Sequence, residues 1–200
     1  MASPTFGSSV RVDRSKFRYE QRKDRGQLPD TFSCGEPELD EFLLKAEAVD
    51  YFEDGEGNTA LVYLGKDLVA YYTISSDSLR SEYVDMRKVS GSHAKREILQ
   101  LETYPAMKIG RLAVQKHWQG QGVGRLLVRR IVALAVRSPG AVRFITLNAK
   151  PRAASFYEKC GFHLTREVLR ERNRINRTMY MDILPLREAI LDGGEYAQGP

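Results

Sequence analysis

The sequence predicts a single α+β domain of three layers, in which helices cover both faces of a mixed sheet of about six to seven strands. Two observations carry this prediction. Apolar runs typical of buried strands occupy residues 108–114 and 142–148. An apolar and basic segment, residues 125–137, lies between them, so that the three form a βαβ unit. The 200 residues, 42% of them hydrophobic, suffice for one domain with a sizeable core.

The domain is expected to span residues 16–191, between disordered tails at residues 1–15 and 192–200. No apolar run approaches the length of a membrane span, and the N-terminus lacks the apolar segment of a signal peptide. Cys34 and Cys160 lack the spacing of metal ligands, and we interpret both as free thiols in a reducing compartment. We therefore expect a cytoplasmic protein that holds no metal.

The N-terminal half is expected to alternate strands with one helix. A first strand at Phe17–Gln21 precedes a helix that has Pro37 in its first turn. The buried stripe of this helix consists of Leu39, Phe42, Leu43, Ala46 and Val49. Residues 59–64 and 68–75 follow as a hairpin. Residues 76–105 then form a long insertion without a clear period, with a short helix near residues 93–100.

A glycine-rich hexapeptide, residues 119–124, connects the first strand of the βαβ unit to its helix. Glycine lets the backbone adopt positive φ and approach a ligand closely. The N-terminus of the following helix favours an anion, and Arg125 and Arg129 add positive charge. The spacing fits neither a Walker loop nor a dinucleotide fingerprint. We interpret the segment as a phosphate loop; a plain turn between strand and helix is the alternative.

The C-terminal part completes the sheet. The central helix stops near residues 138–140, and a short helix at residues 152–159 ends with Gly161 as its cap. Residues 162–164 and 178–183 are expected to pair as the last strands, joined by an arginine-rich linker. A final helical turn or two at Leu184–Leu191 is expected to close the domain.

Four blocks in this order resemble the GNAT N-acetyltransferases. They are Arg111-Leu-Ala-Val114, Gln119-x-x-Gly-x-Gly124, Asn148 and the run from Ala154 to Phe162. The resemblance covers most of the chain, and it implies that the two central parallel strands splay apart around the pantetheine arm of acetyl-CoA. It assigns these residues to acetyl-CoA: Leu112, Ala113, Val114, Gln119, Gly120, Gln121, Gly122, Val123, Gly124, Arg125 and Asn148. Tyr157 is the implied general acid that protonates the departing thiolate; core packing beside Phe156 is the alternative.

A narrower resemblance concerns residues 32–43, where Phe-x-Cys-Gly is followed by Leu-Asp-x-Phe-Leu. This pattern resembles the GNAT branch of toxins that acetylate aminoacyl-tRNA; an ordinary amphipathic helix is the alternative. No Glu or His stands at an obvious general-base position, and we interpret His93, His117 and His163 as structural or surface residues. An α-amino group has a pKa of about 8 and is already partly neutral at pH 7. It therefore depends less on a general base than a lysine side chain does.

Charge is unevenly distributed along the chain. Residues 36–58 carry nine acidic side chains against Lys45, a local charge of −8, which leaves +13 for the remainder. This favours an anionic ligand, and we expect the basic segments 11–25 and 166–177 to contact tRNA phosphates. A solvated acidic helix opposite a solvated basic face is the alternative. Expected partners are acetyl-CoA, an aminoacyl-tRNA, a small DNA-binding antitoxin and, in a homodimer, a second copy of the chain; no membrane is expected. The alternatives are an acetyltransferase for a small amine or a protein N-terminus, and a binding module without turnover.

Overall fold

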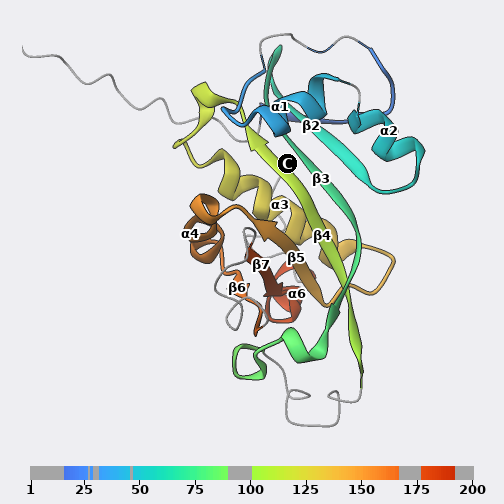
Figure 1. The fold of residues 1–200 in the computed structure, drawn as a ribbon, viewed down its shortest axis with the longest axis vertical. Coiled ribbons are helices and arrows are strands. Elements are labelled where there is room, and N and C mark those ends of the chain that lie inside the picture. Colours follow the sequence, from blue (N-terminus) through green and yellow to red (C-terminus); the bar gives the residue numbers. More distant parts are fainter. Residues whose placement is uncertain are drawn as a thin grey trace, which may run out of the picture.

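The computed structural model describes residues 16–26, 28, 32–45, 47–89, 101–166 and 177–191. These residues form one seven-stranded sheet in the order β1-β2-β3-β4-β5-β7-β6 (Figure 1). The strands are β1 Phe17–Gln21, β2 Asn58–Leu64, β3 Asp67–Arg80, β4 Thr103–Val114, β5 Phe144–Ala149, β6 His163–Leu164 and β7 Arg177–Asp182. Strands β4 and β5 pair in parallel, and the other neighbours pair antiparallel. The predicted mixed sheet is confirmed.

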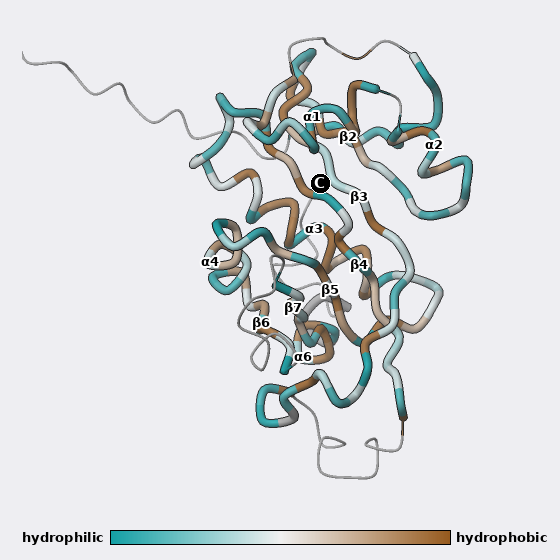
Figure 2. The backbone as a smooth tube through the Cα atoms, in the orientation of Figure 1, coloured by the Kyte–Doolittle hydropathy of each residue, from teal (hydrophilic) through white to brown (hydrophobic). Residues whose placement is uncertain are grey.

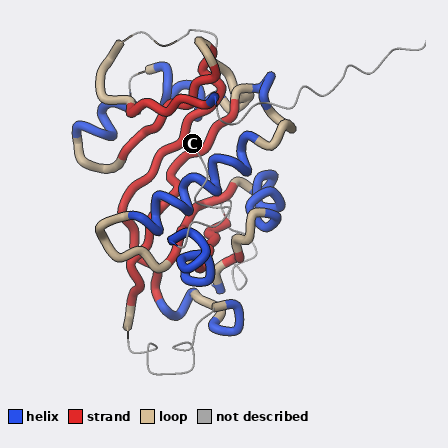
Figure 3. The backbone as a smooth tube through the Cα atoms, turned by 180° about the vertical axis from the view of Figure 1, so that it is seen from behind, coloured by secondary structure: helices blue, strands red, loops and turns tan. Residues whose placement is uncertain are grey.

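Helices cover both faces of this sheet, as predicted (Figures 1 and 3). On one face lie α1 Pro37–Leu44 and α2 Glu47–Glu53; on the other lie α3 Val123–Arg137, α4 Pro151–Lys159 and α6 Leu184–Leu191. The alternation of side chains along β3 separates two apolar clusters: Tyr71 packs with Phe42 of α1, whereas Tyr72 packs with the α3 side. Figure 2 shows the hydrophobic residues concentrated on α3 and the central strands.

The two parallel strands separate halfway along their length. They pair from Ala106 opposite Phe144 to Ile109 opposite Leu147, and beyond this point β4 stays with β3 while β5 stays with β7. The pairing of β3 with β4 shifts register between Thr73 and Ile74, where Gly110 of β4 has no partner. A Cβ on Gly110 would lie 2.7 Å from the Thr73 hydroxyl, so only glycine permits this approach. The splay implied by the family resemblance is therefore present.

Two predicted elements differ from the structure near the N-terminal half. The single helix expected from Pro37 to Val49 is two helices, because a turn at Lys45 lets Ala48 as well as Phe42 pack on the sheet. Ala46 of the predicted stripe lies outside the described residues. Phe42, Leu43 and Val49 are buried as expected.

The insertion is shorter than predicted, since β3 continues to Arg80 and β4 already begins at Thr103. Leu79 and Tyr104 of this long ribbon are buried in a small cluster with Phe144. The sequence did not predict this extension of β3, because three serines and Asp77 weaken the alternation of apolar and polar residues that is typical of a strand. Two 3-10 turns, Ser81–Tyr83 and Met86–Lys88, follow β3. The helix predicted near residues 93–100 lies outside the described residues, as do both predicted tails.

The C-terminal elements follow the prediction closely. Helix α3 begins at Val123, two residues earlier than expected, and Gly161 follows the end of α4 with φ +98°. Strands β6 and β7 pair antiparallel, and α6 is the last element among the described residues. Among the described helices, none is long and apolar enough to cross a membrane.

Candidate active site

The glycine-rich loop has the geometry of an anion-binding turn. Gly120 and Gly122 adopt φ of +75° and +83°, and Gly122 is the N-cap of α3. The first helical hydrogen bond runs from the Leu126 N–H to the Gly122 carbonyl at 3.1 Å. The preceding N–H groups at the start of α3 therefore have no helical carbonyl to pair with. Positive backbone charge and the side chain of Arg125 thus gather at one point.

Gly124 lies within α3 and does not adopt the positive φ that a loop glycine permits. A Cβ at this position would lie 3.1 Å from the ring of Phe156 on α4. Gly124 therefore lets α3 and α4 approach closely rather than shaping the turn itself.

Two glutamines of the loop fix its shape. The Gln119 side-chain amide donates to the carbonyls of Cys34, at 2.8 Å, and Val114, at 2.9 Å. Gln121 donates to the carbonyl of His117 at 2.9 Å. Gln119 thereby ties the Phe-x-Cys-Gly segment to the end of β4, a contact between distant segments that the sequence did not suggest.

A pocket of about 740 Å³, here called the loop pocket, opens beside this turn. Its walls come from the end of β4, the loop, the first turns of α3 and the facing side of α4. The lining residues relevant to the prediction are Leu112, Val114, Gln119, Gly120, Gly122, Val123, Gly124, Arg125 and Tyr157. The structure thus brings most of the predicted acetyl-CoA residues together.

A second pocket of about 950 Å³, here called the charged pocket, lies where β4 and β5 diverge. It contains the two remaining predicted residues that face a cavity, Ala113 and Asn148, the latter exposed near the end of β5. The two pockets share Leu112, Val114, Gln119, Ala153 and Tyr157. They therefore meet at the splayed edge of β4, and Tyr157 stands at the junction.

Tyr157 is suited to donate a proton. Its side chain is buried, and burial, followed by the neighbouring Cys160, raises the pKa of the phenol to about 12. Its ring meets Phe156 and Phe162 edge to face, with centroids 5.0 and 5.6 Å away. The phenol is therefore held in place and fully protonated at neutral pH.

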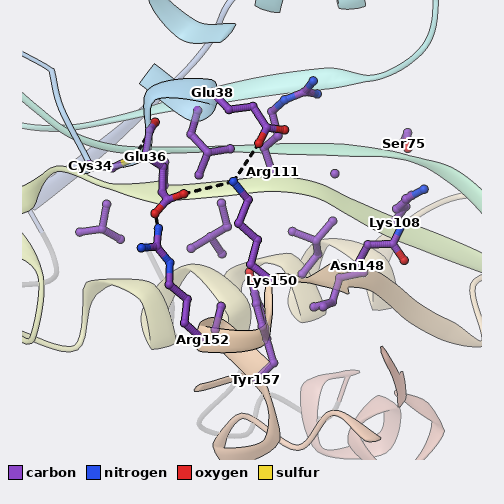
Figure 4. Close-up of a pocket in the computed structure, with 18 of the residues that line it drawn as sticks. Cys34, Glu36, Glu38, Ser75, Lys108, Arg111, Asn148, Lys150, Arg152 and Tyr157 are labelled. Carbon is purple, nitrogen blue, oxygen red and sulfur yellow. Dashed lines mark hydrogen bonds and ion pairs between the residues drawn. The ribbon is translucent and has the colours of Figure 1, made fainter. Parts of the chain in front are cut away.

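The charged pocket also contains ionic groups that the sequence analysis did not select (Figure 4). Lys150, at the start of α4, reaches across to Glu36 at 3.1 Å and to Glu38 at 2.8 Å, and Arg152 pairs with Glu36. The hydrogen bond from Lys150 holds the pKa of Glu38 below its usual range. The sequence contains one indication of these cations. Lys150 and Arg152 directly follow β5, and the residues that follow two neighbouring parallel strands lie at the same edge of the sheet.

The Phe-x-Cys-Gly segment contributes structure rather than a nucleophile. Asp40 accepts hydrogen bonds from the Cys34 N–H and the Ser33 hydroxyl, both at 2.8 Å, and so fixes the entry to α1. Burial, together with Asp40, raises the pKa of the Cys34 thiol to about 12. Although Cys34 lines the charged pocket, its thiol stays protonated and unreactive.

No described histidine lines either pocket: His117 packs on Trp118 and His163 lies beside Tyr180. His93 lies outside the described residues. In the part of the chain that the structure describes, no group of three or more His, Cys, Asp or Glu is arranged to hold a metal ion.

The basic segments expected to contact tRNA are only partly described. Arg22 is buried and donates to the Gly26 carbonyl, Arg25 pairs with Asp50, and Arg166 lies 3.6 Å from Asp85. Arg18 pairs with Glu20, and Arg177 begins β7. The other arginines of these two segments, Arg11, Arg14, Arg170, Arg172 and Arg174, lie outside the described residues.

Known proteins resemble this chain in sequence. Residues 93–183 match the family model of the acetyltransferase (GNAT) domain. A tRNA-acetylating toxin of Mycobacterium tuberculosis (strain ATCC 25618 / H37Rv) is 26% identical over 138 residues, which cover 68% of this chain and 78% of the toxin.

Solved structures extend the likeness to most of the chain. AtaT complexed with acetyl-methionyl-tRNAfMet superimposes with a TM-score of 0.70 and 19% identity, covering 87% of this chain and 99% of AtaT. A tyrosine-to-phenylalanine mutant of the AtaT toxin, bound to the C-terminus of the antitoxin AtaR and acetyl-CoA, gives 0.65 and 17%, covering 88% and 98%. At these identities the likeness shows a shared fold.

Proposed function

Because this chain belongs to the GNAT acetyltransferases, we propose that it transfers the acetyl group of acetyl-CoA to the α-amino group of an aminoacyl-tRNA. The observation that carries the transfer is the meeting of two pockets at Tyr157 and the splayed edge of β4. One pocket suits a phosphate-bearing donor, and the other suits an acceptor that arrives from the opposite side.

The loop pocket is assigned to acetyl-CoA. Its pyrophosphate would lie on the N–H groups of Gly120 to Gly124 and on Arg125, and its pantetheine arm would follow Leu112, Ala113 and Val114 into the splay. Gln119 supports this site through the loop, since its amide is bonded to Cys34 and Val114. Asn148, on the facing strand, is within the same opening and is assigned to the pantetheine amides.

The chemistry is a direct transfer. The neutral amine attacks the thioester carbonyl, a C–N bond forms, and backbone N–H groups on the free edge of β4 stabilise the negative oxygen. The ammonium nitrogen of this tetrahedral intermediate releases a proton to water. The C–O double bond then re-forms and the C–S bond breaks, which leaves the amide product; Tyr157 gives its proton to the departing sulfur and regains one from water. Cys34 forms no acyl intermediate because its thiol stays protonated.

The acceptor assignment has three supports. The relatives reported above include a tRNA-acetylating toxin and a toxin complexed with acetyl-methionyl-tRNA. Neither described histidine reaches the pockets, which suits an α-amino ester that is already partly neutral. Five cations and three carboxylates line the charged pocket, an excess that suits an anionic acceptor.

The wider biological assignment follows from this acceptor. We assign residues 16–191 to one catalytic domain that works in the cytoplasm, where aminoacyl-tRNA is found. The AtaR complex of the structural relative supports a small antitoxin as the protein partner.

The deciding experiment transfers labelled acetyl-CoA to a mixed aminoacyl-tRNA pool and, in parallel, to free amino acids, small amines and N-terminal peptides. Label on the aminoacyl end of one or a few tRNA species is the expected result. Label on a small amine or peptide alone would assign a different acceptor, and thiol release with none of them would indicate a binding module.

A further inference from the structure

Charged side chains from two distant segments form ion pairs within the charged pocket. Glu36 and Glu38 project from the start of α1, while Lys150 and Arg152 project from the start of α4 (Figure 4). Figure 4 shows Lys150 extended between the two carboxylates, with Tyr157 on the same helix below. An acceptor that binds at this part of the pocket must displace these contacts.

These ion pairs are poorly suited to hold the fold together. The side chains of Lys150, Arg152 and Glu38 are 39%, 66% and 72% exposed, and Glu36, at 20%, is the more shielded partner. Ion pairs this exposed contribute little, because water and salt screen them. They can therefore exchange partners readily, and another anion can take the place of a carboxylate.

The surroundings favour an anion at this position. Lys108 and Arg111 also line the pocket, and among the described residues neither forms an ion pair or hydrogen bond with another side chain. The Arg111 guanidinium lies 3.6 Å from the centroid of the Phe42 ring, which holds it in place without using its N–H groups. Lys150 is moreover the N-cap of α4, where the helix dipole favours negative charge.

We propose that Lys150 and Arg152 bind the phosphate of the 3′-terminal nucleotide of the acceptor, and that Glu36 and Glu38 occupy this site in the free protein. The inference rests on the proposed function. Tyr157 lies about 10 Å further along α4, at about 1.5 Å per residue. In an aminoacyl-adenosine 5′-phosphate, about eight bonds separate the amine from the phosphorus and span up to about 10 Å. A phosphate on the two cations can thus place the amine beside Tyr157.

The test compares two acceptors that differ only in this phosphate, a 3′-aminoacyl-adenosine and its 5′-phosphate, together with the intact aminoacyl-tRNA. Wild type should prefer the phosphorylated acceptor by about tenfold or more in kcat/KM. The double variant Lys150→Gln/Arg152→Gln should lose this preference and raise KM for aminoacyl-tRNA by a similar factor. Its thermal shift with acetyl-CoA should match that of wild type, which verifies the fold and the donor site.

Removing the competing carboxylates should have the opposite effect. Glu36→Gln/Glu38→Gln should lower KM for aminoacyl-tRNA by up to about fivefold, because the phosphate no longer has to displace them. Glu41→Gln is the matched control: Glu41 is on the same helix and pairs with Lys45 at 2.9 Å, away from the pocket. Glu41→Gln should leave the KM for aminoacyl-tRNA and the KM for acetyl-CoA unchanged.

The outcomes separate this inference from the proposed function. If wild type acetylates aminoacyl-tRNA but the cation double variant keeps its KM, the phosphate site is wrong and the function stands. Equal use of the two adenosine acceptors by wild type would also overturn the site. If wild type acetylates no aminoacyl acceptor at all, the proposed function fails, and this inference fails with it.

Discussion

Replacing Tyr157 with Phe removes one oxygen from the junction of the two pockets and little else. The ring contacts with Phe156 and Phe162 remain, and the hydroxyl makes no hydrogen bond within the described residues. No buried donor or acceptor is therefore left without a partner, and the free energy of unfolding should change by less than about 0.5 kcal/mol. The variant isolates the proton of the phenol from the packing of its ring.

The loss in turnover follows from the role of general acid, which contributes about 10²- to 10⁴-fold. We expect kcat to fall by at least about 10² while KM for acetyl-CoA stays within about twofold. Because the pKa of Tyr157 is raised to about 12, the phenol keeps its proton throughout the neutral and mildly alkaline range. The wild-type rate should therefore rise with pH as the acceptor amine loses its proton, near pH 8, and Tyr157 should cause no decline below about pH 10.

Release of free CoA measures turnover, and titration calorimetry measures acetyl-CoA binding. Tyr180→Phe is the control, because Tyr180 is also buried but lines neither pocket. This control should keep wild-type kcat even if it loses stability, since its hydroxyl accepts a hydrogen bond from the Asp85 N–H at 3.0 Å. Wild-type kcat in Tyr157→Phe would refute the acid role and leave Tyr157 as a packing residue.

Three further variants test other parts of the site. Arg125→Gln should weaken acetyl-CoA binding by about tenfold or more, measured by calorimetry, because it removes a charged donor to phosphate; unchanged affinity would contradict the assignment. Gly124→Ala should cost about 1 kcal/mol and lower the Tm, because its Cβ would lie 3.1 Å from the Phe156 ring; an unchanged Tm would show that the ring moves freely. Cys34→Ala should keep wild-type turnover, and iodoacetamide should not inactivate wild type, since the thiol pKa is about 12; rapid inactivation would contradict this.

The sequence predicts best what local patterns encode. The βαβ unit, the loop before α3 and the short helix ending at Gly161 follow from apolar runs, glycines and a helix cap within a few residues of one another. The break between α1 and α2 was missed because both halves continue one apolar period. The long ribbon of β3 and β4 was missed because serines on its exposed side weaken the alternation.

The roles of single residues were harder to predict than their positions. Gln119 and Gly124 belong to the motif and lie beside the expected pocket, yet Gln119 bonds to Cys34 and Val114 and Gly124 faces Phe156. A sequence motif indicates which residue type belongs at a position. It does not indicate whether the side chain contacts the ligand or supports the backbone that contacts the ligand.

The charged pocket shows why part of a site cannot be predicted from local sequence patterns. Glu36 and Lys150 belong to different segments, and their meeting depends on the splay that lets α1 and α4 face each other across the end of β4. The strong local acidity of residues 36–58 suggested an acidic face opposite a basic one. The structure instead places the first two of those carboxylates against Lys150 and Arg152, in the pocket that Tyr157 also lines. The splay of β4 and β5 thus brings together opposite charges that, in the proposed function, an anionic acceptor must separate before its amine can reach Tyr157.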